Sequence, residues 1–154
     1  MVQRQGVYEM SSSTDDLRDL LSALRDGVMF YAEAGERAEH VAHRELFAQM
    51  ATDKRAAART VEKLLGPIER PADGTWSAKI REAYTRIRAL LSADKDTVFI
   101  NELEAAEDRV VEHFMRCLCT AVEPDTHRVL ERIYPAALAA HQRMREMKHA
   151  AVAN

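Results

Sequence analysis

The residues best suited to chemistry are a glutamate and a histidine that lie on two regular helical patterns of the chain. Glu107 lies on an apolar stripe that continues to Phe114, and His141 lies on a later stripe near the carboxyl end. A carboxylate and an imidazole are ordinary ligands of iron and manganese, so the two predict a metal site if their helices pack together. Glu104, one turn before Glu107, would add a carboxylate, although its position off the stripe favours exposure or a local salt bridge.

Two other groups of potential ligands are weaker evidence for a metal site. Glu36, His40 and His43 share a face only if one helix runs through a segment where a turn is expected. His113 and Cys117 are four residues apart, a spacing that allows chelation but is more typical of core packing. Neither group predicts a metal site by itself.

The two cysteines, Cys117 and Cys119, stand two apart on a predicted helix and therefore point about 200° away from each other. That geometry does not suit a disulfide, so we expect two reduced thiols. The sequence contains no Gly-rich phosphate loop and no Ser-His-Asp set, so hydrolytic and nucleotide chemistry have no support.

Four long amphipathic segments position these residues. Apolar side chains recur in them at alternating steps of three and four, which is the period of a helix that faces a bundle. The patterns predict helices at residues 15–38, 44–65, 96–121 and 125–149. Residues 1–13 show no periodicity and predict a flexible tail that ends in a serine cap, and residues 150–154 predict a second tail.

The connections between the segments differ in length. Two are short hairpins, whereas the segment from Gly66 to Lys95 is long and carries a further short amphipathic pattern that starts at Trp76. A bundle with one long crossover is the ferritin-like arrangement, so we predict an all-α, four-helix bundle with an additional short helix in its crossover. A five-helix array is the alternative.

Short stretches of the chain resemble known families. Residues 24–27, 31–34, 46–47 and 50–51 look like the opening hairpin of rubrerythrin-type ferritin-like proteins. Residues 101–108, Asn-Glu-Leu-Glu-Ala-Ala-Glu-Asp, are similar to the third helix of an uncharacterised bacterial family of ferritin-like four-helix-bundle proteins. The resemblance extends over about residues 15–148 and implies the same fold.

The resemblance also implies where a dimetal site would lie. Each half of a ferritin-like bundle carries a ligand Glu seven residues before an aromatic residue, and then Glu-x-x-His on the following helix. In the second half of this chain, Glu107 stands seven before Phe114, and Leu138-x-x-His141 follows. Two of these three ligand positions therefore keep a residue that binds metal.

The first half keeps none of its ligands. Leu24 stands seven before Tyr31, and Lys54-x-x-Ala57 follows at nearly the same spacing as in the second half. The matching spacings support an internal duplication. A carboxylate-bridged dimetal centre needs roughly four carboxylates and two imidazoles, so the sequence predicts that this centre and its oxidase, peroxidase or storage activities are absent.

Lys54 suggests what replaces the metal. Its ammonium group lies on the apolar stripe of the second helix, across the bundle from Glu107, and an unpaired buried charge would be very costly. We therefore predict a metal-free polar cluster of Lys54, Glu107, His141 and Tyr31. In the alternative interpretation, Lys54 extends to solvent and His141 is simply a hydrogen-bonded core histidine.

Composition narrows the range of partners. The 154 residues match one domain, and the net charge of −3 offers no attraction for nucleic acid. No apolar run approaches the roughly 20 residues of a membrane span and no signal peptide is evident, so we expect a cytoplasmic protein. The basic residues around the crossover helix favour a solvated face, and the exposed side of that helix suggests a homodimer.

Three functions follow from these observations. The first is a non-enzymatic bundle without a cofactor that acts through binding, self-assembly or a stress-associated structural role. The second is a metal-binding protein that holds iron or manganese through Glu107 and His141, with Glu104 as a further ligand. The third is a small-ligand binder, which requires a cavity beside the small residues Gly27, Gly35 and Ala57.

Overall fold

The computed structural model describes residues 2–67, 82, 85 and 94–153, with side chains described from residue 13 onward. This part of the chain forms four helices and contains no strand: α1 (Val2–Arg37), α2 (Val41–Leu65), α4 (Lys95–Thr120) and α5 (Pro124–Val152). None of the helices in these ranges is both long and apolar enough to cross a membrane.

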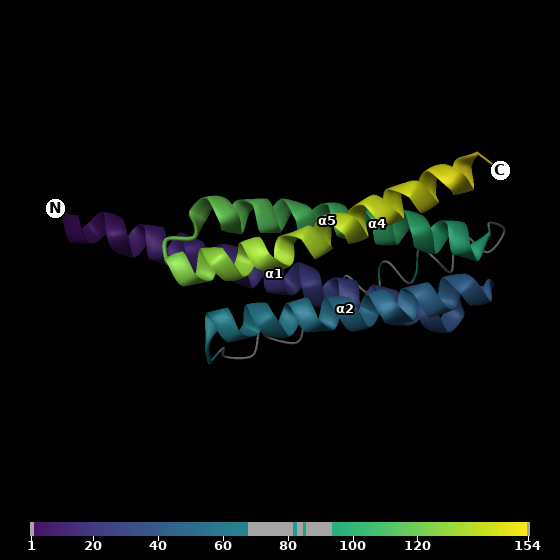
Figure 1. The fold of residues 1–154 in the computed structure, drawn as a ribbon, viewed down its shortest axis with the longest axis horizontal. Coiled ribbons are helices and arrows are strands. Elements are labelled where there is room, and N and C mark those ends of the chain that lie inside the picture. Colours follow the sequence, from purple (N-terminus) through teal and green to yellow (C-terminus); the bar gives the residue numbers. More distant parts are fainter. Residues whose placement is uncertain (1, 68–81, 83–84, 86–93, 154) are drawn as a thin grey trace.

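The helices form two antiparallel hairpins joined by the long crossover. A turn at residues 38–40 joins α1 to α2, and a turn at residues 121–123 joins α4 to α5. Figure 1 shows that α2 and α4 run in the same direction, because the crossover returns the chain to the end of the bundle where α2 began. This arrangement confirms the predicted all-α four-helix bundle, whereas the short helix predicted from Trp76 lies mostly outside the described residues.

The amino-terminal prediction is wrong in one respect. α1 begins at Val2 rather than near Asp15, so most of the segment expected to be a flexible tail is helical. This segment contains one glycine and no proline, and nothing in it breaks a helix that is anchored further along by packing. At the other end α5 continues to Val152, three residues beyond the predicted boundary.

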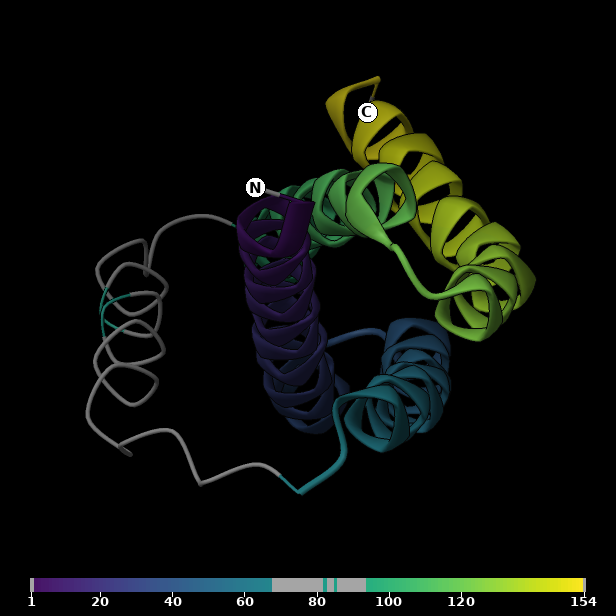
Figure 2. The same ribbon diagram turned by 90° about the vertical axis from the view of Figure 1, so that its left-hand side faces the viewer.

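The core consists of two apolar clusters that follow one another along the bundle. The first contains Leu24, Val110 and Phe114, and the second contains Phe47 and Leu103. Figure 2 shows α1 packed between α2 and α4, with α5 packed against α4. α2 and α5 make little direct contact, so the bundle is less tightly closed along that side.

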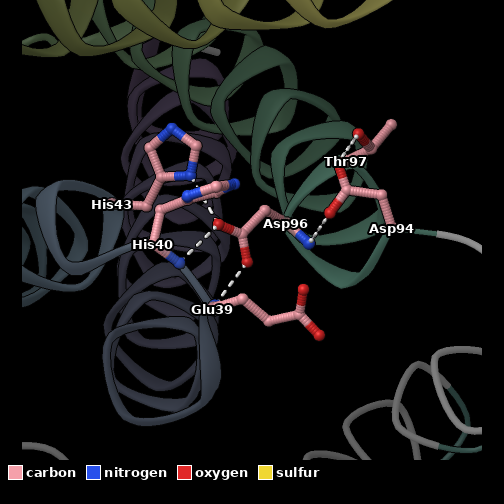
Figure 3. Close-up of polar contacts among 6 residues, drawn as sticks. All are labelled: Glu39, His40, His43, Asp94, Asp96 and Thr97. Atoms are coloured by element: carbon pink, nitrogen blue, oxygen red, sulfur yellow. Dashed lines mark hydrogen bonds and ion pairs between the residues drawn. The ribbon is translucent and has the colours of Figure 1, made fainter.

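A carboxylate of α4 fixes the α1–α2 turn (Figure 3). Asp96 is buried and accepts hydrogen bonds from the backbone N–H groups of Glu39 (2.6 Å) and His40 (3.1 Å), and its other partner is the ring Nδ1 of His43 (2.6 Å). His40 occupies the N-cap position of α2 but forms no capping bond with its own side chain. Asp96 therefore satisfies amide groups at the start of a neighbouring helix, which normally depend on a local cap.

Candidate functional site

The centre of the bundle holds a buried ion pair between α2 and α4. Lys54 Nζ donates to Glu107 Oε2 at 2.6 Å, and the hydroxyl of Tyr31, on α1, donates to Glu107 Oε1 at 2.7 Å. Lys54 is 6% exposed, and the other two are fully buried. Both carboxylate oxygens thus have a donor, as a buried charge requires. The interpretation in which Lys54 extends to solvent is wrong.

The surrounding residues support this arrangement. Gly27, one turn before Tyr31, leaves room for the lysine: a Cβ at this position would lie 3.2 Å from Lys54 Cγ. The Lys54 ammonium also lies 5.8 Å from the centre of the Tyr31 ring, within the range of a cation–π contact. Burial, and then the charge and hydrogen bond of Glu107, raise the pKa of Tyr31 far above its usual range. Tyr31 therefore remains a protonated donor.

These residues do not fit a dimetal centre. Two donors, Lys54 and Tyr31, engage the carboxylate that would have to bind metal. The neighbouring ligand positions carry hydrocarbon: Leu24 is buried, and Leu138 is 41% exposed on the outside of α5. A dimetal centre would require several more carboxylates than this core contains, so the chemistry of such centres has no ligand set here.

His141 does not join the cluster, which corrects the prediction that it does. The buried positions of α5 are Leu130, Ala137 and Met144, and His141 lies at the edge of this stripe. Its Nε2 contacts Oδ1 of Asp108 on α4 instead. The alternative in which Glu107 and His141 share a metal stays a prediction, although both oxygens of Glu107 accept hydrogen bonds from Lys54 and Tyr31.

The structure brings His141 together with Glu104 and Asp108. One potential ligand atom from each lies within 4.8 Å of the others. Asp108 was not among the predicted residues, although its spacing of four from Glu104 was the signal that could have revealed it. Glu104 is 9% exposed and accepts a hydrogen bond from Lys148 Nζ, on α5, at 2.8 Å, so the prediction of exposure or a local salt bridge is wrong.

A pocket of about 360 Å³ lies between α2 and α5. Its floor includes Leu24, Lys54 and Phe114, so it reaches the side of the buried ion pair. Its remaining lining residues come from α2 and α5, and they are Leu46, Met50, Asp53, Ala57, Ile133, Ala136, Ala137, Ala139, Ala140 and Arg143. A pocket beside Ala57, which a small-ligand binder would require, is therefore present.

Gly27 and Gly35, beside which the small-ligand interpretation also required a cavity, do not line this pocket. Gly27 contacts the side chain of Lys54 instead. Gly35 permits close approach of α1 and α2, because a Cβ there would lie 3.2 Å from the backbone nitrogen of Ala48.

Two further groups of potential ligands were considered from the sequence: one contains Glu36 and His43, and the other contains His113. The turn at residues 38–40 separates Glu36 from His43, which pairs with Asp96. His113 Nδ1 is buried and has no hydrogen-bond partner among the described residues.

The cysteines remain free, with Cys117 buried and Cys119 exposed. Burial, and then the charges of Asp16 and Asp19, raise the pKa of Cys117 to about 12. Cys117 is therefore a buried, protonated thiol, in line with the core packing that its spacing from His113 favoured.

A crystal structure from Anabaena variabilis has a similar fold. It is a two-domain protein that contains DJ-1/ThiJ/PfpI-like and ferritin-like domains, and it matches with a TM-score of 0.54 and 18% sequence identity. The match covers 94% of this chain and 39% of that chain, so this chain spans well under half the length of the two-domain protein. At this identity the likeness shows the fold alone, which is a ferritin-like four-helix bundle.

Sequence comparisons give the family. No curated protein matches the chain. A family model described as a domain of unknown function, DUF2383, matches residues 12–119, which is well over half of the chain. The chain therefore belongs to the DUF2383 family.

Proposed function

We propose that this protein is a non-enzymatic binding protein whose ligand is a small amphipathic anion. The proposal rests on the pocket between α2 and α5, which combines an apolar interior with Arg143, a cationic group that forms no ion pair with any residue that the structure describes. Its volume of about 360 Å³ lies at the lower end of the range of small-molecule sites. The ligand would therefore be small, with a hydrocarbon body and one acidic head group.

The sequence of α5 explains why the pocket exists. Four of its alanines line the pocket, Ala136, Ala137, Ala139 and Ala140, and their methyl groups do not reach α2. Larger side chains at the same level, Leu24 and Phe114, form the floor from the other two helices. A groove lined in this way favours a hydrocarbon ligand, because burying apolar surface of both partners is favourable.

The charges at the pocket favour an acidic head group. Arg143 lines the pocket and is exposed, and its guanidinium group forms no ion pair with another described residue. Asp53, which also lines the pocket, already accepts a hydrogen bond from Gln49 Nε2 at 2.8 Å. Lys54 is committed to Glu107. Arg143 is thus the group available to bind a carboxylate, for which a guanidinium is well shaped.

The lining also argues against catalysis in this pocket. It contains no imidazole, thiol or hydroxyl side chain, and its ionisable groups are Asp53, Lys54 and Arg143. General acid–base catalysis needs a side chain that can exchange a proton with the ligand, and nucleophilic catalysis needs an activated nucleophile, but Asp53 is bonded to Gln49 and Lys54 is paired with Glu107. Binding without turnover is the function that these groups support.

Isothermal titration of the full chain with decanoate and with 1-decanol tests the proposal. We expect saturable 1:1 binding of decanoate, and Arg143→Gln should weaken it about tenfold, since a charge-assisted hydrogen bond contributes about 1.5–3 kcal/mol. Binding of 1-decanol should not change in this variant. Arg145→Gln, two residues further along α5 and also exposed, is the matched control and should behave as wild type.

A second pair of variants tests the location. Ala136→Phe places an aromatic ring at an exposed position of the pocket wall and should abolish decanoate binding, whereas Ala150→Phe, exposed on α5 outside the pocket, should leave it unchanged. Absence of saturable binding in the wild type would contradict the proposal. Wild-type affinity in Ala136→Phe would show that the ligand binds elsewhere.

A further inference from the structure

We infer that Glu104, Asp108 and His141 form a binding site for a single divalent transition-metal cation on the α4–α5 face of the bundle. The site is separate from the core ion pair and from the pocket, because none of the three residues lines the pocket. Glu104 and Asp108 are four apart on α4 and project to one face, and His141 reaches them from α5. The set joins two oxygen donors to one nitrogen donor.

The positions of the ligand atoms suit one ion. Atoms bound to one cation at about 2.0–2.2 Å lie roughly 3–4 Å apart, so a set within 4.8 Å needs only a small adjustment. Glu104 and His141, with side chains 12% and 17% exposed, are held by the packing of α4 and α5. Asp108 is 58% exposed and is free to make that adjustment.

The local charges already favour a cation. Two carboxylates converge on this face, and one of them holds the ammonium of Lys148 at 2.8 Å. That ammonium group competes with a metal for Glu104. Because the Lys148 side chain is 40% exposed, it can move into solvent when a divalent ion with the higher charge binds.

The donor set also indicates which ion binds best. One imidazole and two carboxylates suit Zn²⁺ and its neighbours, and affinity for such a site rises from Mn²⁺ and Fe²⁺ towards Zn²⁺. Nε2 of His141 already contacts Oδ1 of Asp108, so two of the three ligands face each other, and a metal bound between them would replace that contact. We therefore expect one Zn²⁺ per chain, with water in the remaining coordination positions.

Titration of the metal-free full chain with Zn²⁺, and with Co²⁺ followed by visible absorption, tests this site. We expect one ion per chain, and His141→Ala should weaken binding at least tenfold. His127→Ala is the matched control, because His127 Nδ1 pairs with Glu131 at 3.5 Å along one helix and forms no three-ligand cluster among the described residues. This control should keep wild-type affinity.

Lys148→Met distinguishes metal binding at the proposed site from metal binding elsewhere on the protein. Removing the competing ammonium should tighten Zn²⁺ binding several-fold, whereas it would leave adventitious binding at another histidine unchanged. Wild-type affinity in His141→Ala, or no gain in Lys148→Met, would overturn the inference. The circular dichroism of each variant checks that it is folded, and decanoate binding should be the same in all of them.

Discussion

At the scale of single residues, the feature that sets this bundle apart is a buried carboxylate whose two oxygens are occupied by an ammonium and a phenol. Removing two charges from water carries a desolvation cost of several kcal/mol for each ion, and their attraction offsets it only when the geometry is good. Glu107 meets that condition, because Lys54 and Tyr31 donate to different oxygens at 2.6 and 2.7 Å. The stability of the core should therefore depend on keeping the set complete.

Replacing Lys54 alone tests this dependence. Lys54→Met should lower the free energy of unfolding by about 3–5 kcal/mol, because it leaves Glu107 buried without its counter-ion. The double variant Lys54→Met with Glu107→Leu should recover part of the loss, since two apolar side chains need no partner, although the buried Tyr31 hydroxyl then loses its acceptor. Urea unfolding at neutral pH measures both. A double variant no more stable than Lys54→Met would show that Glu107 does not depend on the lysine.

The sequence could predict the Lys54–Glu107 contact because both residues lie on apolar stripes, where a charge must find a partner. It could not predict the surroundings of His141. That residue lies at the edge of the α5 stripe, and whether it turns inward or towards α4 depends on how α5 is rotated in the bundle. Asp108 was not predicted because it pairs with His141 only when α5 is rotated so that His141 points towards α4.

At the scale of helices, the hairpin of α1 and α2 is fastened to α4 by one side chain. Burial alone would raise the pKa of Asp96, but hydrogen bonds from Glu39, His43 and His40 outweigh it and hold the pKa below its usual value of 3.8. A group with a lowered folded-state pKa stabilises the protein above its unfolded-state pKa. That stabilisation is lost as the pH falls through the folded-state pKa.

Asp96→Asn should therefore change how stability depends on pH. At pH 7 the variant should be about 2 kcal/mol less stable, because it loses charge-assisted hydrogen bonds at a helix start. The difference should shrink as the pH falls below 3.8, where the carboxylate of the unfolded chain takes up a proton, and it should be lost once the pH falls through the lower folded-state pKa. Urea unfolding at pH 7 and pH 3 gives both values. Asp53→Asn, exposed on α2, is the control, and a gap of equal size at the two pH values would contradict the assignment.

Gly35 lies where α1 and α2 pack closely, so a larger side chain at this position should destabilise the protein. Gly35→Ala would ordinarily stabilise a helix by about 1 kcal/mol. Here the new Cβ would meet backbone atoms, 3.2 Å from Ala48 N and 3.4 Å from Arg44 O, and these atoms move only if the helices separate. We expect a net loss of about 1 kcal/mol in thermal unfolding. A higher melting temperature would show that the helices are not in tight contact at this point.

Apolar patterns in the sequence predict the buried part of a helix but not a part that extends beyond the core. Apolar stripes predicted the buried lengths of all four helices, since those stripes form the core. The first dozen residues of α1 carry no such stripe, and Figure 1 shows this end of the helix extending past the rest of the bundle. The role of Asp96 was likewise hidden, because its partners are more than fifty residues away in the sequence.

At the scale of the whole molecule, two short turns and one long crossover were enough to predict the ferritin-like topology. The pocket could not be predicted, because it depends on the distance between α2 and α5, and these helices are not neighbours in sequence. The two proposed sites occupy different seams of the bundle: the anion pocket lies between α2 and α5, and the cation site lies between α4 and α5. The expected homodimer remains a prediction.

We propose that the ion pair of Lys54 and Glu107 takes the place of a dimetal centre in the core of this bundle. The most direct test is elemental analysis of the Asp108→Ala variant after exposure to Fe²⁺ or Mn²⁺ and removal of excess metal. This variant lacks one of the three ligands of the proposed cation site on the α4–α5 face, but its core residues Lys54, Glu107 and Tyr31 are intact. We predict that it retains no stoichiometric metal. Two ions per chain in this variant would have to bind in the core that the ion pair fills. That result would contradict the proposal that the ion pair replaces a dimetal centre.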